Sequence, residues 1–467
     1  MMTGSTPLAA WTMLLALSAT TCEELPQRTQ DPQPRQEYLQ AATGIANWLR
    51  THETRTETGL RWPNTPEASP ESSIALYHGN SGVVLFLLGM HNSAVEQVEK
   101  DRYLADARLA ADGLIARLPQ PGTNDAIDSG LYTGIAGVGF TLTQVARVTG
   151  DEKYKRAAVH CLEVVNQQAT KTSTDSDSNS AAWNNSTDII SGTAGIGLYL
   201  LDAHKSLEDQ DALQLARQAG NSLLALAQET EAGLSWKMSP DYPRDMPNFS
   251  HGTAGVAYFL CQLGQETGEQ KYLNAAIRGA KHLLAIADRE HGGLCIFHHA
   301  PGGEDLFYLG WCHGPPGTAR LFYALAQATG DDEWHTYVHS AAASIMQSGI
   351  PAESTPGFWN NHGSCCGTAG VAEFFLELVH AYEKTEYHAF SQKLVSELLS
   401  SANPQIVDGA HHLNWRHAEH RVQPDNLSTH TGYMQGAAGI GLTLLRMHAA
   451  EHQQTPPIRL PDSPFED

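Results

Sequence analysis

Residues 310–325 read GWCHGPPGTARLFYAL, a glycine-rich turn that leads directly into an apolar run. Variants of this phrase occur seven times along the chain, and their first glycines are Gly79, Gly134, Gly192, Gly252, Gly314, Gly367 and Gly436. Successive glycines are 53 to 69 residues apart. A period of this size is typical of a repeat architecture in which each repeat is one supersecondary unit. We therefore expect seven such units.

Each phrase opens an apolar helix, and an amphipathic helix precedes it. The amphipathic stretches have a period of about 3.6 residues and cover roughly residues 35–52, 102–118, 152–169, 211–228, 270–287, 332–349 and 387–402. A helix that is apolar on all sides is buried, whereas an amphipathic helix covers it. The sequence thus predicts an all-α fold, an (α/α) barrel or toroid of seven helical hairpins with seven inner and seven outer helices.

The repeats define one body, with the two ends of the chain outside it. We assign residues 35–450 to the toroid, 451–467 to a C-terminal tail, and 1–34 to a leader-like segment with a flexible tether. The apolar run at residues 8–19 (LAAWTMLLALSA) is too short to span a membrane. Two interpretations stay open: an export signal that ends in lipid attachment at Cys22, and an uncleaved or mis-started leader.

Composition limits the class of partner. The 467 residues are 41% hydrophobic and 17% charged, as in an ordinary soluble globular protein. The formal net charge of -22 argues against binding to a phosphate backbone, so we expect no nucleic-acid partner. Seven cysteines are too few and too scattered for a disulfide framework in a chain this long. Cys161 and Cys261 lie in apolar helical patterns, which predicts buried free thiols.

The chemistry is expected where the repeats differ. The residue before the first glycine varies, and reads in chain order His78, Thr133, Ser191, His251, His313, Cys366 and Gln435. Because a toroid brings all seven turns to one mouth, Cys312 should meet the adjacent pair Cys365 and Cys366 there. Three soft thiolates suit Zn2+ and leave its fourth position open, as in catalytic zinc sites. The sequence predicts a zinc site with these three ligands.

Two histidines and one aspartate near the same mouth are candidates for proton transfer. His251 and His313 occupy the variable position, as His78 does in the first repeat. Asp188 lies shortly before Gly192 and either caps a helix or orients a catalytic histidine. Other histidines are expected to be exposed loop residues without a chemical role, namely His298, His299, His411, His412 and His417. Residues 171–187 are expected to form a flexible polar loop.

These motifs resemble those of the lanthionine synthetase C-like family, the LanC-like proteins and lanthipeptide cyclases. The resemblance rests on WCHG at residues 311–314 and CCGTAG at residues 365–370, and it extends over about residues 36–450. It implies a double-ring helical toroid with a central zinc ion. The zinc ligands implied are Cys312, Cys365 and, in place of the histidine common in the family, Cys366.

The resemblance also implies roles for the polar residues. The family's proton-transfer histidine falls on His251, its aspartate on Asp188, and the residue after the first cysteine is His313. An arginine found a few residues before that cysteine in some cyclases has no match, because Tyr308 stands there. The activity implied is a zinc-dependent Michael addition of a cysteine thiol to dehydroalanine or dehydrobutyrine in a peptide.

Several alternatives remain at this point. The thiol could instead be glutathione or another small thiol, or the protein could be a non-catalytic, zinc-stabilised scaffold that binds peptides. An (α/α)-barrel glycoside hydrolase or epimerase would need paired carboxylates at the mouth, where thiols and imidazoles stand. The implied partners are a dehydrated precursor peptide and a separate dehydratase, and the implied location is the cytoplasm.

Overall fold

The computed structural model describes Met1 and residues 36–119, 127–172, 179–289 and 293–465. The chain divides into two units, Met1–Pro34 and Arg35–Asp467, and the fold is that of the second unit. The apolar run of the leader-like segment and Cys22 lie outside the described residues. In the described ranges, no helix combines the length and the apolar character needed to cross a membrane.

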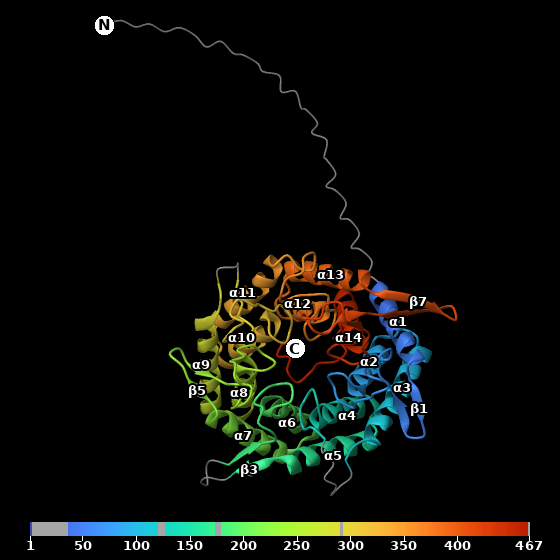
Figure 1. The fold of residues 1–467 in the computed structure, drawn as a ribbon, viewed down its shortest axis with the longest axis horizontal. Coiled ribbons are helices and arrows are strands. Elements are labelled where there is room, and N and C mark those ends of the chain that lie inside the picture. The colour runs from blue at the N-terminus through green and yellow to red at the C-terminus, as the bar shows by residue number, and fades with distance from the viewer. Residues whose placement is uncertain (2–35, 120–126, 173–178, 290–292, 466–467) are drawn as a thin grey trace. The chain divides into compact units, whose positions relative to one another are not determined.

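Fourteen α-helices in these ranges alternate between an inner and an outer ring (Figure 1). The inner ring consists of α2 (Asn80–Ser93), α4 (Ile135–Thr149), α6 (Thr193–Leu207), α8 (Thr253–Thr267), α10 (Pro315–Thr329), α12 (Thr368–Tyr382) and α14 (Ala437–Glu451). The outer ring consists of α1 (Glu37–Thr51), α3 (Gln97–Ile115), α5 (Glu152–Gln168), α7 (Gln210–Ala225), α9 (Gln270–Ile286), α11 (Glu333–Gln347) and α13 (Thr385–Ser400). The predicted toroid with seven inner and seven outer helices is confirmed.

Burial separates the rings as the hydrophobic patterns predict. In inner helix α4, every residue from Ile135 to Val145 is buried. Outer helix α9 buries one stripe at three- and four-residue spacing, formed by Tyr272, Ala275, Ala276, Gly279, Ala280 and Leu283. The hydrophobic effect therefore places α4 inside and lays α9 over the ring with its polar face outward.

Each inner helix packs most extensively against the outer helix that follows it, as α4 does against α5. The first outer helix, α1, packs on the last inner helix, α14, and closes the ring. The sequence pattern pairs each outer helix with the inner helix after it, so the hairpins are offset by one helix from that expectation. Linker length is the reason, because two residues join α4 to α5 whereas 24 residues separate α5 from α6.

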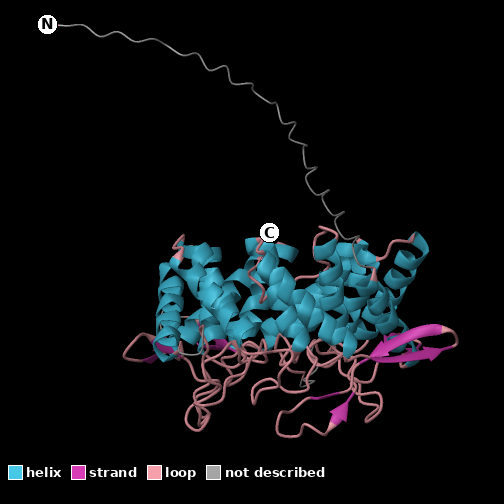
Figure 2. Ribbon diagram, turned by 90° about the horizontal axis from the view of Figure 1, so that it is seen from above, coloured by secondary structure: helices cyan, strands magenta, loops and turns pink. Residues whose placement is uncertain are grey.

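The long linkers gather on one face of the toroid (Figure 2). They carry five two-stranded antiparallel sheets: β1 (Thr54–Thr56) with β2 (Gly59–Arg61), β3 (Thr170–Thr172) with β4 (Ser180–Ala182), β5 (Gln228–Glu229) with β6 (Leu234–Ser235), β7 (Asn403–Val407) with β8 (Ala410–Asn414), and β9 (His417–Ala418) with β10 (Leu427–Ser428). The expectation of a flexible loop at 171–187 is wrong in part, because β3 and β4 pair there; residues 173–178 lie outside the described ranges.

Seven backbone hydrogen bonds join the glycine turns into a closed belt. The residues of the belt stand two positions before the first glycine of each repeat and are Tyr77, Tyr132, Ile190, Ser250, Cys312, Cys365 and Met434. Each bond runs from the N–H of one repeat to the carbonyl of the next, at 2.8 to 3.1 Å, and the last returns from Met434 to Tyr77. Between the third and fourth repeats the donor is Ile189 instead of Ile190. All seven turns therefore meet around one mouth.

The described end of the chain lies inside the ring (Figure 1). Ile458 and Leu460 are buried, and the buried ring of Phe465 lies 4.6 Å from that of Tyr323 in α10. Arg446 of α14 donates a hydrogen bond to the carbonyl of Ile458. Residues 458–465 are thus part of the toroid's packed interior.

A buried ionic cluster holds this C-terminal segment, and consists of Arg320, Arg446, Glu373, Glu377 and Asp462. Arg320 lies 3.0 Å from Glu377 and 3.7 Å from Asp462, and Arg446 lies 3.4 Å from Glu373. The cluster thus contains two guanidinium groups and three carboxyl groups. Burial raises the pKa of Glu377 to about 7, with the charge of Arg320 opposing the rise. The Glu377 carboxyl therefore keeps its proton over much of the range below pH 7.

Glu377→Gln should flatten the pH dependence of stability. The folded-state pKa of Glu377 is about 7, above the ordinary value of about 4.3. The folded state therefore holds a proton that the unfolded state loses between these values, so the free energy of unfolding falls as pH rises through this window, by on the order of 3 kcal/mol. Denaturant unfolding at pH 5, 6 and 7 measures this slope.

The control is Glu163→Gln, which changes a largely exposed carboxyl on outer helix α5. We expect the slope of the control to equal that of the wild type. Parallel stability curves for wild type and Glu377→Gln would contradict the prediction.

Candidate metal centre

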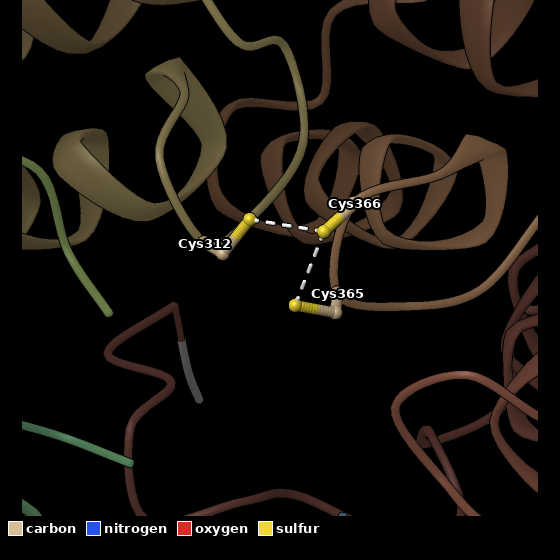
Figure 3. A group of neighbouring side chains, drawn as sticks. All are labelled: Cys312, Cys365 and Cys366. Carbon is tan, nitrogen blue, oxygen red and sulfur yellow. Dashed lines mark hydrogen bonds between the residues drawn. The ribbon is translucent and has the colours of Figure 1, made fainter. Parts of the chain in front are cut away.

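Three cysteine sulfurs converge where the turns before α10 and α12 meet (Figure 3). The Sγ of Cys366 lies 3.3 Å from that of Cys312 and 3.4 Å from that of Cys365. Cys312 and Cys365 are neighbours in the belt, where the N–H of Cys312 donates to the carbonyl of Cys365. The three sulfurs all lie within 4.8 Å of one another, and among the described residues they form a group of ligand atoms that could share one metal ion.

Close backbone approach explains the second glycine of each phrase. A Cβ at Gly317 would lie 2.1 Å from the carbonyl oxygen of Trp311, and one at Gly370 would lie 2.0 Å from that of Ser364. Both distances are far inside van der Waals contact, so these positions require glycine. Glycine in the first turn of α10 and of α12 thus allows the tight turns that present the cysteines.

The chemistry of the three thiols fits Zn2+. With Zn–S bonds of about 2.3 Å, tetrahedral geometry places sulfurs about 3.8 Å apart, close to the separations here. Hydrogen bonds from the neighbouring thiols lower the pKa of Cys365, whereas burial raises the pKa of Cys312. The buried thiols thus share protons, and a bound cation would take the place of those protons, because metal ligation deprotonates thiols.

A cavity of about 440 Å³ opens beside the sulfurs. This volume is within the range of pockets that hold small molecules. Its walls come from the glycine turns and from the loop between β9 and β10. The lining includes all three cysteines and five imidazoles, those of His78, His251, His298, His313 and His420. A substrate in this cavity would therefore meet the thiol cluster and the imidazoles together.

His251 and Asp188 form a hydrogen-bonded pair. The Nδ1 of His251 lies 2.6 Å from the Oδ2 of Asp188, whose side chain is 2% exposed. The other oxygen of Asp188 accepts the N–H groups of Ser191 at 2.9 Å and Gly192 at 2.7 Å. Asp188 therefore both caps the turn before α6 and orients His251. Because a carboxylate accepts hydrogen bonds, Nδ1 of His251 carries the proton and Nε2 is the nitrogen left for substrate.

His313 is a buried, neutral imidazole beside this pair. Its ring lies 5.5 Å from that of His251 and 4.2 Å from that of His298. Burial, assisted by the neighbouring imidazoles, lowers the pKa of His313 well below its ordinary value and that of His298 to about 4. The Nδ1 of His313 has no protein hydrogen-bond partner. This nitrogen is buried, so it is a polar atom whose hydrogen-bonding capacity no described residue meets.

The expectation that the loop histidines are exposed is correct for His411 and wrong for the others. His299 is buried and contacts His298 through their Nδ1 atoms at 2.8 Å. His412 and His417 are also buried. Folding of the long linkers back over the mouth encloses these side chains, which the local sequence does not reveal. Of the five, His298 lines the cavity.

Five linker residues that line the cavity were not expected from the sequence, namely Trp359, Glu419, His420, Arg421 and Val422. The positive charge of Arg421 lies near Tyr308 and opposes the rise that burial causes in the pKa of that phenol. A guanidinium group therefore enters from the β9–β10 loop, although Tyr308 stands where some cyclases carry arginine. These residues lie in linkers outside the repeated phrase, so the period gives no signal for them.

Cys365→Ala should abolish metal binding without unfolding the protein. We expect about one zinc per chain in the wild type and none in the variant, because two thiols remain where a site requires three or four ligands. Elemental analysis of the purified proteins measures zinc, and circular dichroism checks the fold. The matched control is Cys161→Ala, which removes a buried thiol from outer helix α5. Equal zinc in the Cys365 variant and the wild type would refute these ligands.

Comparison with known proteins agrees with this geometry. A sequence model described as "Lanthionine synthetase C-like protein" matches residues 70–460. Among solved structures, nisin cyclase has a TM-score of 0.58 at 18% identity, over 88% of this chain and 92% of its own, a likeness in fold. The α-1,6-mannanase from Salegentibacter sp. HEL1_6 has a TM-score of 0.47 at 13% identity, over 89% of this chain and 99% of its own. The chain belongs to the lanthionine synthetase C-like family.

Proposed function

We propose that this protein is a zinc-dependent enzyme that adds a cysteine thiol to dehydroalanine or dehydrobutyrine in a peptide, forming a thioether. The observation that supports it best is one cavity lined by three converging thiols and by His251, which Asp188 orients. Family membership and the fold shared with nisin cyclase support the same class of reaction. The substrate would reach this site already dehydrated by a separate protein.

The thiol cluster would hold the metal. Cys312, Cys365 and Cys366 supply three ligands, and the cavity beside them gives access for a fourth. Zinc bound there would supply an open coordination position at which a substrate thiol is held as thiolate near neutral pH. The cavity walls orient the dehydrated residue and limit the access of water.

We assign the proton transfers of the reaction to His251. Its Nε2 accepts the proton of the incoming thiol, while Asp188 stabilises the imidazolium through Nδ1. After sulfur bonds to the β-carbon, the electron pair of the carbon–carbon double bond moves to the α-carbon and its carbonyl. His251 then returns a proton to the α-carbon, so the addition is balanced and needs no oxidant or reductant. His313 remains neutral and lies beside His251 in the wall of the cavity.

The β9–β10 loop supplies charge to the cavity. In the addition, negative charge develops on the carbonyl oxygen of the dehydrated residue. Arg421 is the one lysine or arginine among the described residues that line the cavity, and its charge lies near the phenol of Tyr308. We assign Arg421 to binding that oxygen, where a guanidinium group stabilises the transition state.

A small thiol such as glutathione is the second candidate for the nucleophile. Glu419 and Arg421 present a carboxylate and a guanidinium to the same cavity, which suits a thiol compound with its own ammonium and carboxylate groups. Two dehydroalanine peptides separate the candidates. One carries an internal cysteine, and the other lacks cysteine and is mixed with glutathione. Mass spectrometry after thiol alkylation shows which of them forms a thioether.

His251→Ala should lose activity and keep its metal. Removing a general acid–base costs about 100- to 10,000-fold in rate, and His251 is not one of the three converging ligands. The assay is thioether formation on the two peptides above, with zinc measured in parallel. The control is His411→Ala, an exposed histidine on β8. A zinc-loaded wild type that acts on neither peptide would contradict the proposed enzymatic activity and favour a non-catalytic, zinc-stabilised scaffold.

Arg421→Gln should lower kcat by about 10- to 100-fold with an unchanged zinc content, because it removes a charge needed mainly in the transition state. Arg416→Gln is the matched control: this arginine lies on the same linker, and its guanidinium group is 3.7 Å from Glu67. Steady-state kinetics on the preferred peptide separates kcat from KM. A loss confined to KM would instead assign Arg421 to ground-state binding.

A further inference from the structure

The indole of Trp311 links the thiol cluster to the C-terminal segment. Trp311 directly precedes Cys312 and is 4% exposed. Its Nε1 donates a hydrogen bond to the Oδ2 of Asp462 at 3.1 Å. A buried indole N–H without an acceptor would carry the full cost of desolvation, so Asp462 favours one placement of this ring.

Aromatic side chains complete the pocket that surrounds the indole of Trp311. The ring of Tyr132 lies 5.3 Å from that of Trp311, and the ring of Phe249 lies 5.6 Å from it, both edge to face. Tyr132 and Phe249 belong to turns of other repeats. These contacts restrict the indole of Trp311 within its pocket. The hydrogen bond to Asp462 is directional, so it sets the depth and the rotation of the indole.

Asp462 is itself held firmly. Arg320 of α10 donates to the backbone carbonyl of Asp462 at 2.9 Å and lies 3.7 Å from its carboxylate. The next residue, Ser463, donates its hydroxyl to Glu377 of α12 at 2.5 Å. Asp462 thus ties residues 458–465 to the inner helices that begin just after the two cysteine turns.

Cys312 depends on this support more than the other two thiols do. Cys365 and Cys366 share one turn, so their sulfurs move together, whereas Cys312 comes alone from another turn. The backbone of Cys312 is held at two points of the belt, by Ser250 and by Cys365. The Trp311–Asp462 hydrogen bond is a third point of attachment for this turn.

We propose that the C-terminal segment is part of the metal centre, and that Asp462 is a positioning residue that fixes Cys312 through Trp311. The inference rests on the proposed zinc site. The small cavity behind the turns agrees with it, because Asp462 and Trp311 line it together with Ser364, the residue before Cys365. Asp462 therefore lies behind both cysteine turns.

The test measures metal geometry and affinity separately from activity. In Asp462→Ala and in Trp311→Phe, zinc affinity, determined by competition with a chromophoric chelator, should fall by about 10- to 100-fold, as for other residues that orient metal ligands. With Co2+ in place of zinc, the thiolate-to-cobalt and ligand-field absorption bands should shift in both variants. In the double variant, the loss should be no greater than in either single one, because both remove the same hydrogen bond.

Phe465→Ala is the matched control, since it removes a buried aromatic contact of the same segment that does not reach Trp311. It should lower stability and leave the cobalt spectrum and zinc affinity unchanged. Asp462→Leu is similar in shape but offers no acceptor to the indole N–H, and it serves if the alanine variant does not fold.

Two outcomes are distinguishable. A wild type that binds neither Zn2+ nor Co2+ would overturn the proposed function and this inference with it. A wild type that binds both, with Asp462 and Trp311 variants of unchanged affinity and spectrum, would overturn the inference alone and leave Asp462 with a structural role.

Discussion

The closed belt of backbone hydrogen bonds is the constraint on which the site depends. Each bond contributes only about 1 kcal/mol net, less than the roughly 2 kcal/mol from burying one large apolar side chain of an inner helix. The main effect of the belt is therefore position. It brings turns that are 53 to 69 residues apart in the sequence around one mouth, and it closes only when the seventh repeat returns to the first. Cys312 and Cys365 meet because they are consecutive members.

The repeat made much of this arrangement predictable from the sequence. Glycine spacing and hydrophobic period predict the two rings, and the departures from the repeat at Cys312, Cys366 and His251 identify the mouth. The sequence left Asp188 between capping a helix and orienting a catalytic histidine. One of its oxygens accepts N–H groups of the turn before α6, and the other lies 2.6 Å from Nδ1 of His251. The inference succeeds where a residue has an equivalent in every repeat, because its place then follows from symmetry.

Residues without such equivalents could not be placed. Arg421 lies in a linker, Asp462 lies beyond the last repeat, and His417 is buried by a linker that folds back over the mouth. Their positions result from long-range packing, for which a single sequence carries no periodic signal. Arg320 and Glu377 are charged residues within apolar inner helices. They could have predicted a buried ionic contact, since buried charges require partners. Their partner, the C-terminal segment, has no such mark in the sequence.

The division of labour at each turn explains how chemistry is added to this fold. The belt residue contributes its backbone to the belt of hydrogen bonds, and the glycines allow neighbouring backbone segments to approach closely. The residue at the variable position stands between the belt residue and the first glycine, and its side chain is needed for neither purpose. Five of the seven residues at that variable position line the cavity, namely His78, Thr133, His251, His313 and Cys366. Substitution there changes the reactive groups without breaking a backbone hydrogen bond. Cys312 and Cys365 are the exceptions, because the backbone of each belongs to the belt while its side chain belongs to the thiol cluster. Cys312 has no second cysteine in its turn, so a support from outside the repeat is most useful at that position.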